Sequence, residues 1–301
     1  MKKYFKWLSK NTHPLTNKLV IFIGATGSIG KEALEYLLML ETKVIIGARN
    51  VEKANNLKQQ LLLKYPQATI FVEHIDVSSL DSIDTFQKVL TSKYPKADFF
   101  INNSGVYHLP KNFSKDGYEI HFATNALGNY YLAKRIIENL KENSKMVFVS
   151  SLSANFYKIN FQDFESVNCK NKMKVYAQSK RIMLSNTISL KEELKNIDIN
   201  VIHPGICATE LFNKSHGKFF MKIIFPIMKL IFHSPKKASL NILKGLFIKT
   251  EINEWICPRF IGVWGYPKIK KIAKRIYKKE NINRSFELTN NLIKQHINKK
   301  W

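Results

Sequence analysis

Residues 18–30 read KLVIFIGATGSIG, an apolar run that leads into Gly24, Gly27 and Gly30. The apolar run predicts a buried strand over 18–23, and apolar residues at helical spacing after the glycines predict a helix. Glycines at such a turn let the backbone approach a pyrophosphate, and the N-terminus of the following helix offers free N–H groups and a positive dipole end. Strand, turn and helix together predict a dinucleotide-binding fingerprint.

Further apolar runs alternate with helical stretches along the chain. They predict strands over 44–49, 69–73, 98–102, 145–149 and 198–202. Near-continuous apolar strands are typical of a parallel sheet that is covered on both faces. The 301 residues, 45% of them hydrophobic, can bury one large core, and no repeat or linker divides them. We therefore predict a single-domain α/β Rossmann fold over 18–301, a doubly wound parallel sheet with helices on both faces, after a basic N-terminal extension over 1–17.

Tyr176 and Lys180 lie four residues apart in a predicted helix and therefore share one of its faces. A tyrosine hydroxyl has a pKa near 10 in water, and a neighbouring cation lowers that pKa by favouring the phenolate. The pair therefore predicts an acid/base device, in which Lys180 lowers the pKa of Tyr176. An isolated Tyr-x-x-x-Lys is more often part of a surface helix, so the surrounding motifs have to decide between the two interpretations.

Seven motifs occur in one order over residues 18 to about 210. They are the glycine turn, Asp76 after a strand, Asn102-Asn103-Ser104-Gly105, Asn125, Ser150-Ser151 at a strand end, the Tyr176/Lys180 pair and His203-Pro204-Gly205. This order resembles the short-chain dehydrogenase/reductase family, a Rossmann-fold family that moves hydride between a nicotinamide and an alcohol or carbonyl. The Gly-x-x-Gly-x-x-Gly spacing departs from the classical members and is more typical of extended ones. The chain after the catalytic motif is short for an extended member, which favours the classical assignment.

The resemblance implies roles for particular residues. The catalytic set is Asn125, Ser151, Tyr176 and Lys180, and the cofactor contacts are Gly24, Thr26, Gly27, Ser28, Ile29, Gly30, Arg49, Asp76, Asn102, Gly105, Tyr176, Lys180, Pro204 and Gly205. Tyr176 exchanges the proton, Ser151 holds the reacting oxygen, Lys180 binds the nicotinamide ribose, and Asn125 anchors a water chain. The alternatives are a backbone-satisfied helical amide for Asn125 and a strand-end turn for Ser150 or Ser151.

The end of the second strand indicates which cofactor is bound. An NAD enzyme usually has an acidic residue there for the ribose 2′-hydroxyl, but this strand ends in Gly47-Ala48-Arg49. Arg49, with Lys53 one turn further, can offer charge and a planar donor fork to a 2′-phosphate. We therefore expect NADP(H), with NAD(H) as the alternative. The alternative for Arg49 is an ordinary loop cation in a basic protein.

Two features are similar to the retinol dehydrogenases and related reductases of lipophilic carbonyls. Ser151 and Tyr176 are 25 residues apart, a longer connection than compact members have, and HPGICATEL follows from His203. The resemblance implies a substrate lid over about 211–235 and a lipophilic carbonyl or alcohol substrate. Oligomerisation is common in this family, and the sequence leaves it open.

The formal net charge of +25 comes mainly from the two ends of the chain. Residues 1–18 hold five basic and no acidic residues, and residues 211–301 hold 20 basic and four acidic ones. Compositional drift, nucleic-acid binding and contact with an anionic membrane compete as explanations. No recognition motif supports nucleic acid. Apolar residues 219–232 with two lysines fit a membrane interface or a lid, and the spacing over 268–279 predicts an amphipathic helix.

The remaining patterns place the chain in a reducing compartment and predict no metal site. The three cysteines have neither a metal-ligand spacing nor an even count, and His74, His121 and His233 show no pattern with carboxylates. The N-terminus has no apolar core and no cleavage site of a secretory signal, so we expect a cytoplasmic protein that is peripheral to a membrane or free of it. The rival to an enzyme is a non-catalytic cofactor-binding or membrane-surface protein that retains the fold.

Overall fold

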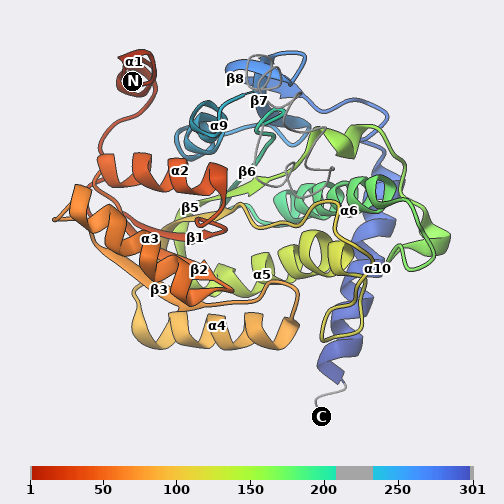
Figure 1. Ribbon diagram of the computed structural model, residues 1–301. Coiled ribbons are helices and arrows are strands. Elements are labelled where there is room, and N and C mark those ends of the chain that lie inside the picture. Colours follow the sequence, from red (N-terminus) through yellow and green to blue (C-terminus); the bar gives the residue numbers. More distant parts are fainter. Residues whose placement is uncertain (1, 208–232, 299–301) are drawn as a thin grey trace, which may run out of the picture.

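The computed structural model describes residues 2–207 and 233–298, built around one eight-stranded sheet (Figure 1). The strand order is β3-β2-β1-β4-β5-β6-β7-β8, with β1 to β7 parallel and β8 antiparallel to β7. The strands are β1 (Leu19–Ile23), β2 (Lys43–Ala48), β3 (Ile70–His74), β4 (Ala97–Asn102), β5 (Leu140–Val149), β6 (Asp198–Ile202), β7 (Glu254–Phe260) and β8 (Trp264–Lys271). The predicted fold class and the six predicted strands are confirmed.

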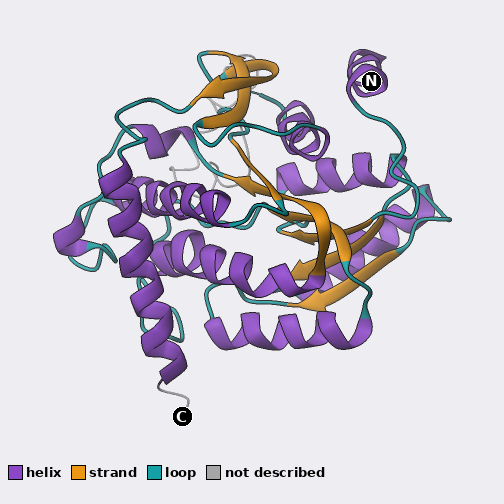
Figure 2. Cartoon of the chain, turned by 180° about the vertical axis from the view of Figure 1, so that it is seen from behind, coloured by secondary structure: helices purple, strands orange, loops and turns teal. Residues whose placement is uncertain are grey.

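Helices cover both faces of the sheet, as Figures 1 and 2 show from opposite sides. The main helices are α1 (Lys2–Asn11), α2 (Ser28–Met39), α3 (Val51–Lys64), α4 (Leu80–Lys93), α5 (Asn129–Ile136), α6 (Lys172–Glu193), α9 (Pro235–Phe247) and α10 (Lys279–Asn298). Short turns of helix are η1 (Phe122–Gly128), η2 (Ile137–Asn139), η3 (Leu152–Asn155) and η4 (Phe161–Asp163). None of the helices in the described residues is long and apolar enough to cross a bilayer.

Alternate residues of β1 enter two separate cores. Val20 and Phe22 pack with α2, α3 and α9, whereas Ile21 and Ile23 pack with α4, α5 and α6. Successive side chains of a strand point to opposite faces, so a strand buried on both faces must be apolar at every position. This requirement explains the unbroken run that ends at Gly24, and it fixes where the glycine turn leaves the sheet.

The amphipathic helix predicted over 268–279 is wrong. Residues up to Lys271 form β8, which pairs with β7 from Glu254↔Lys271 to Phe260↔Trp264, and α10 begins only at Lys279. The apolar residues at helical spacing also fit a strand and the turn after it. Pairing with β7 satisfies the backbone there, so tertiary contact overrides the local pattern.

The N-terminal extension is a docked helix. Leu8 of α1 is buried, and α1 packs on α9, with Lys244 Nζ donating to Asn11 Oδ1 at 3.1 Å. The predicted apolar segment 219–232 and the predicted lid residues 211–232 lie outside the described residues. Of the predicted lid, the structure describes only residues 233–235, where His233 is buried and α9 begins.

Candidate active site

An open cleft of about 400 Å³ lies at the carboxyl ends of β1 to β4. Because β1 is central, with β2 on one side and β4 on the other, the chain crosses over at this point and the loops diverge to leave a crevice. Its walls are Ile23, Gly24, Thr26, Gly27, Ser28, Ile29, Gly47, Ala48, Arg49, Lys53, Ile75, Asp76, Val77, Asn103, Ser104, Gly105, Val106 and Thr124. Most of the predicted cofactor residues are therefore brought together here.

The three glycines of the turn have different surroundings. A Cβ at Gly30 would lie 2.2 Å from Gly24 O, and one at Gly24, where φ is +81°, would lie 2.7 Å from the Asn103 backbone. The chain itself therefore excludes side chains at these two positions. A Cβ at Gly27 would meet nothing closer than Gly24 O at 3.5 Å, so the space beside Gly27 is left open to the cleft.

The N-terminus of α2 lies in the same cleft. Gly27 is its N-cap and no side chain caps the helix, so its first N–H groups remain available beside a positive dipole end. An open glycine face and an uncapped helix end are the features that a pyrophosphate needs. Arg49, directly after β2, and Lys53, in the first turn of α3, line the cleft with exposed side chains. The residues present thus fit a dinucleotide.

The turn after β4 uses its two asparagines differently. Asn102 is buried, and its Oδ1 accepts from Ser104 N at 3.2 Å and from Ser104 Oγ at 2.6 Å. Asn103 lines the cleft and donates from Nδ2 to Gly24 O at 3.0 Å, which ties the two turns together. Asn102, the predicted cofactor contact, is not in the wall of the cleft and its role stays a prediction, whereas the place of Asn103 was not predicted. Strand alternation at the end of β4, which turns neighbouring side chains to opposite sides, was the available signal.

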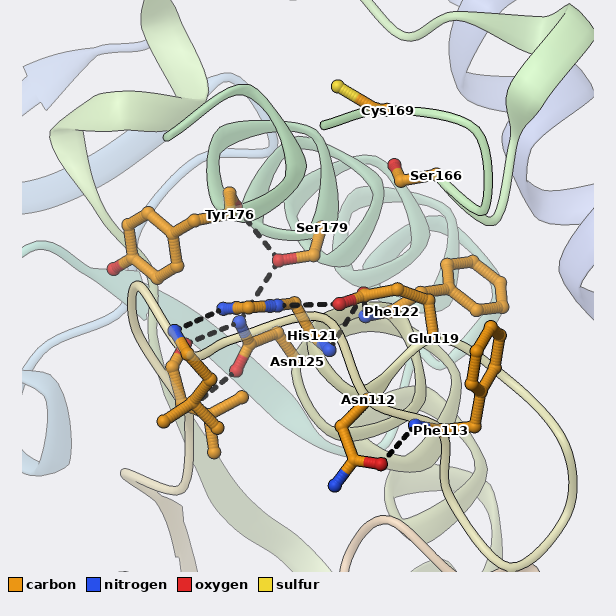
Figure 3. Close-up of polar contacts among 12 residues, drawn as sticks. Asn112, Phe113, Glu119, His121, Phe122, Asn125, Ser166, Cys169, Tyr176 and Ser179 are labelled. Carbon is orange, nitrogen blue, oxygen red and sulfur yellow. Dashed lines mark hydrogen bonds and ion pairs between the residues drawn. The ribbon is translucent and has the colours of Figure 1, made fainter. Parts of the chain in front are cut away.

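Asn125 joins the turn after β4 to α6, as Figure 3 shows. Its Nδ2 donates to Val106 O at 2.9 Å and to Ser179 Oγ at 3.0 Å, and its Oδ1 accepts from Val106 N at 2.8 Å. Asn125 lies in η1, a π-helical segment of the kind that often marks functional sites. The side chain is fully buried, and its amide is satisfied by backbone and by one hydroxyl.

Lys180 is buried where Gly105 and Asn125 meet. A Cβ at Gly105 would lie 3.0 Å from Asn125 Oδ1 and 3.2 Å from Lys180 Nζ. Lys180 Nζ donates to Val149 O at 3.1 Å, at the end of β5. Burial lowers the pKa of Lys180 to about 8.

Tyr176 stands half-buried on the same helix. Burial raises its pKa to about 12, although hydrogen bonds with the Ser151 and Ser153 hydroxyls act to lower it. The expected lowering of this pKa by Lys180 is wrong for this arrangement, because desolvation dominates and the ammonium is directed to the Val149 carbonyl. At neutral pH the Tyr176 hydroxyl therefore carries its proton.

The two serines at the end of β5 lie differently, since Ser151 contacts Tyr176 and Ser150 is buried. Ser151 Oγ accepts from Ser153 N at 3.2 Å and from Ser153 Oγ at 2.9 Å, and Ser151 caps η3. Ser150 is buried, and its Oγ has no hydrogen-bond partner among the described residues. The strand-end turn that was weighed as the alternative is thus present, and it coexists with the contact from Ser151 to Tyr176.

His203 supports the serine turn from behind, since its Nδ1 accepts from Leu152 N at 3.1 Å. Pro204 and Gly205 follow it but do not line the cleft that the described residues form. Gly205 has a φ of +87°, and a Cβ there would lie 2.7 Å from Val263 O. Their predicted contact with the cofactor therefore stays a prediction.

Two groups near the site escaped the sequence analysis. Tyr107 packs edge-on against Tyr176, with ring centroids 4.7 Å apart. His121, treated as isolated, is instead buried with Glu119, whose Oε1 lies 2.7 Å from its Nδ1 (Figure 3). His121 Nε2 accepts from Leu109 N at 3.1 Å, so the pair anchors the loop that carries Tyr107. Among residues 2–207 and 233–298, no cluster of three potential metal ligands occurs.

Two buried histidines should make the protein sensitive to acid. Burial lowers the pKa of His203 to about 3 and that of His233 to about 4. Between these values and the ordinary pKa near 6.5, the unfolded chain binds more protons, so stability falls as the pH falls. We expect each histidine to lower the free energy of unfolding by about 2 kcal/mol between pH 7 and pH 5.

Urea denaturation at both pH values measures this loss in the wild type, in His203→Gln and in His74→Gln. His74 is exposed, so its variant is expected to keep the wild-type pH dependence. His203→Gln should lose about half of it. An unchanged loss in His203→Gln would show that other groups control the acid sensitivity.

Comparisons with known proteins agree with this site. Residues 18–218 match the family described as short chain dehydrogenase. Short-chain dehydrogenase TIC 32 B, chloroplastic, from Brassica napus is 34% identical over 220 residues, which cover 68% of this chain and 69% of that protein. Retinol dehydrogenase 14 from Mus musculus is 31% identical over 229 residues, covering 71% and 69%.

Solved structures share the fold. A protein from Mycobacterium paratuberculosis matches with a TM-score of 0.75 and 21% identity, covering 94% of this chain and 95% of that one. The NADP complex of RhlG from Pseudomonas aeruginosa matches with a TM-score of 0.60 and 17% identity, covering 79% and 91%. At these identities the likeness establishes the architecture alone.

Proposed function

Since the chain belongs to the short-chain dehydrogenase family, it is an oxidoreductase that acts on CH–OH groups with a nicotinamide cofactor. We propose that it interconverts a lipophilic aldehyde or ketone and its alcohol, and that its cofactor is NADP(H). The observation that carries the proposal is that Ser151 contacts Tyr176, while Lys180, one turn further along the same helix, lies beside Gly105 in the wall of a cleft that fits a dinucleotide. The likeness to retinol dehydrogenase 14 and the aromatic wall of Tyr107 support a lipophilic substrate.

The bound cofactor supplies or removes the hydride, and the chain manages the proton. With a pKa of about 12, the Tyr176 hydroxyl is protonated at neutral pH and can donate to a carbonyl oxygen in the direction of reduction. Ser151, which shares a hydrogen bond with that hydroxyl, can hold the same oxygen. The protonated hydroxyl is the form that proton donation in reduction requires.

Lys180 and Asn125 organise the floor of this site. Lys180, with a pKa of about 8, is mostly an ammonium at neutral pH, and its contact with the open edge at Gly105 suits it to a ribose hydroxyl. Asn125 holds Val106 and Ser179 in place, and its proposed part in proton resupply rests on this position between the cleft and α6. Asp76 lines the cleft with an Oδ1 that accepts from Ser78, and we assign it to the adenine.

Arg49→Glu should reverse the cofactor preference. A carboxylate at the end of β2 repels a 2′-phosphate and can accept from a 2′-hydroxyl. We expect the Kd for NADPH to rise about 30-fold or more, since one charge-assisted contact is replaced by repulsion, whereas the Kd for NADH stays within a fewfold. Fluorescence titration with each cofactor measures both constants without any guess about the substrate.

Lys43→Glu is the matched control, because Lys43 is an exposed cation at the opposite end of the same strand and its substitution changes the net charge equally. It should leave both constants unchanged. If Arg49→Glu keeps the wild-type preference, Arg49 does not read the cofactor. If the wild type binds neither cofactor, the result supports the alternative of a non-catalytic protein.

That alternative is a cofactor-binding or membrane-surface protein without turnover. The presence of a full set of catalytic candidates is evidence against this alternative, because a protein without turnover has no physical need for all four. The set is Tyr176, Ser151, Lys180 and Asn125. We further propose that the protein is cytoplasmic and peripheral to a membrane, which is supported by its basic flanks and the lipophilic character of the proposed substrate.

A further inference from the structure

The hairpin between β7 and β8 ends in an apolar tip, residues 260–264. Phe260 is 51% exposed, Ile261 is 87% exposed and Trp264 is 48% exposed. Phe260 and Trp264 are paired across the turn, with ring centroids 5.2 Å apart. Three large apolar side chains therefore stand together in solvent rather than singly.

The conformation of the tip does not favour stability either. Ile261 has a φ of 50°, which is an outlier for a β-branched residue and costs conformational energy. Neither its exposure nor its backbone conformation stabilises the fold, and a polar residue or glycine would suit the position better. Such a residue persists where the tip has another use.

The tip continues into a wider aromatic and basic surface. Trp264, Tyr266 and Lys268 alternate along one exposed face of β8. Lys237 of α9 lies over the rings of Trp264 and Tyr266, at 4.9 Å and 5.3 Å from their centroids, and Trp7 of α1 stacks on Tyr266 at 6.5 Å. Figures 1 and 2 both show α1, α9 and this hairpin at one end of the molecule.

The positive charge around the hairpin indicates the kind of partner that the tip would bind. Residues 255–279 hold eight Lys and Arg residues and no Asp or Glu. Apolar side chains at a tip, Trp and Tyr behind them and cations around them match the order of a bilayer interface, from acyl chains to anionic headgroups. We propose that the hairpin tip and the exposed face of β8 dock on an anionic lipid bilayer. This deepens the peripheral-membrane part of the proposed function and rests on it.

The hairpin also borders the active site. A Cβ at Gly262 would lie 3.6 Å from Leu152 Cδ1, and Leu152 directly follows Ser151. Docking through the tip therefore holds the serine side of the site next to the lipid. A lipophilic substrate dissolved in the bilayer then reaches Ser151 and Tyr176 without crossing bulk water.

Co-sedimentation of the full chain with vesicles tests the docking surface. The vesicles contain phosphatidylcholine alone or mixed with phosphatidylserine. Ile261→Glu removes the apolar tip and adds a negative charge, whereas Leu63→Glu makes the same kind of change at a side chain that is also 87% exposed. Leu63 lies on α3, which packs on β2 and β3 at the far edge of the sheet from β8.

The wild type and Leu63→Glu should bind the mixed vesicles more tightly than phosphatidylcholine alone, and added salt should weaken this binding. Ile261→Glu should bind the mixed vesicles at least about tenfold more weakly, because the variant loses an aliphatic side chain that would enter the lipid on docking. Its NADPH affinity and its turnover of a water-soluble carbonyl should be unchanged, which separates failure of docking from failure of the proposed enzyme.

Equal binding by the two variants, or no preference of the wild type for anionic vesicles, would overturn the proposal. So would a wild-type dimer that Ile261→Glu converts to a monomer without any vesicle binding, because a second copy of the chain would then cover the tip. Quenching of tryptophan fluorescence by brominated lipid gives an independent readout. The quenching should fall in Trp264→Phe, and an unchanged value would place Trp264 away from the lipid.

Discussion

Tyr176→Phe is expected to lower kcat by about 10²–10⁴-fold while NADPH affinity stays at the wild-type value, because the variant removes one proton donor and keeps the ring. The ring packs edge-on against Tyr107, and phenylalanine preserves this contact. The lost hydroxyl is the one that shares hydrogen bonds with Ser151 and Ser153. Initial rates of NADPH oxidation with a panel of lipophilic aldehydes and ketones measure the loss.

Tyr277→Phe is the matched control for this experiment. Its hydroxyl lies 3.4 Å from Glu192 Oε1, at the end of α6 remote from Tyr176. Glu192 lies sixteen positions after Tyr176 along α6, a distance of about 24 Å. The control should keep wild-type rates. Wild-type turnover in Tyr176→Phe would remove this residue from the mechanism.

Two alanine substitutions in the glycine turn should fail in different ways. Gly30→Ala puts a methyl group 2.2 Å from Gly24 O and 2.8 Å from Ala25 Cα, both backbone atoms of the same tight turn. Because backbone cannot move aside as a side chain does, we expect a loss of about 3 kcal/mol or more in the free energy of unfolding. Urea denaturation measures this loss.

Gly27→Ala should instead fold and lose the cofactor. Its methyl group would meet only Gly24 O at 3.5 Å, and its φ of −78° and ψ of 165° suit alanine, so the stability should change by about 1 kcal/mol or less. The same methyl group occupies the space that a pyrophosphate needs, so the Kd for NADPH should rise about tenfold or more. Wild-type affinity in Gly27→Ala would mean that the phosphates do not approach this turn.

The parallel core of the fold was predictable because its strands contain apolar runs, the clearest being the unbroken run Leu19–Ile23 of β1. Ile21 and Phe22 face different cores, yet both must be apolar, and the run is visible without any partner strand. The β7–β8 hairpin lacks this signal. Pro258 interrupts the apolar run of β7, and Ile269 and Ile272 fit a helix as well as a strand, so only the pairing of the two strands decides the structure.

The sequence predicts those site residues that belong to a recognisable motif. It does not predict residues whose place in the site depends on contacts between distant parts of the chain. The contact of Ser151 with Tyr176 and the place of Lys180 beside Gly105 fit the order of the motifs, and the roles of these residues stay predictions. That Asn103 rather than Asn102 lines the cleft depends on how the chain leaves β4, and the contact of Tyr107 with Tyr176 depends on a loop held by His121. The pKa of Tyr176 depends on burial, which no local spacing reports.

The docking of α1 on α9 has a consequence for the order in which the chain folds during synthesis. Residues 2–11 precede the whole sheet in the chain, but the partners of Asn11 and Trp7 are Lys244 and Tyr266. At a synthesis rate of roughly 5–20 residues per second, the helix waits on the order of tens of seconds for them. During that interval Leu8 and Trp7 present an apolar face to the nascent chain and to chaperones. Residues 2–11 thus reach their native place only after α9 and β8 have been made.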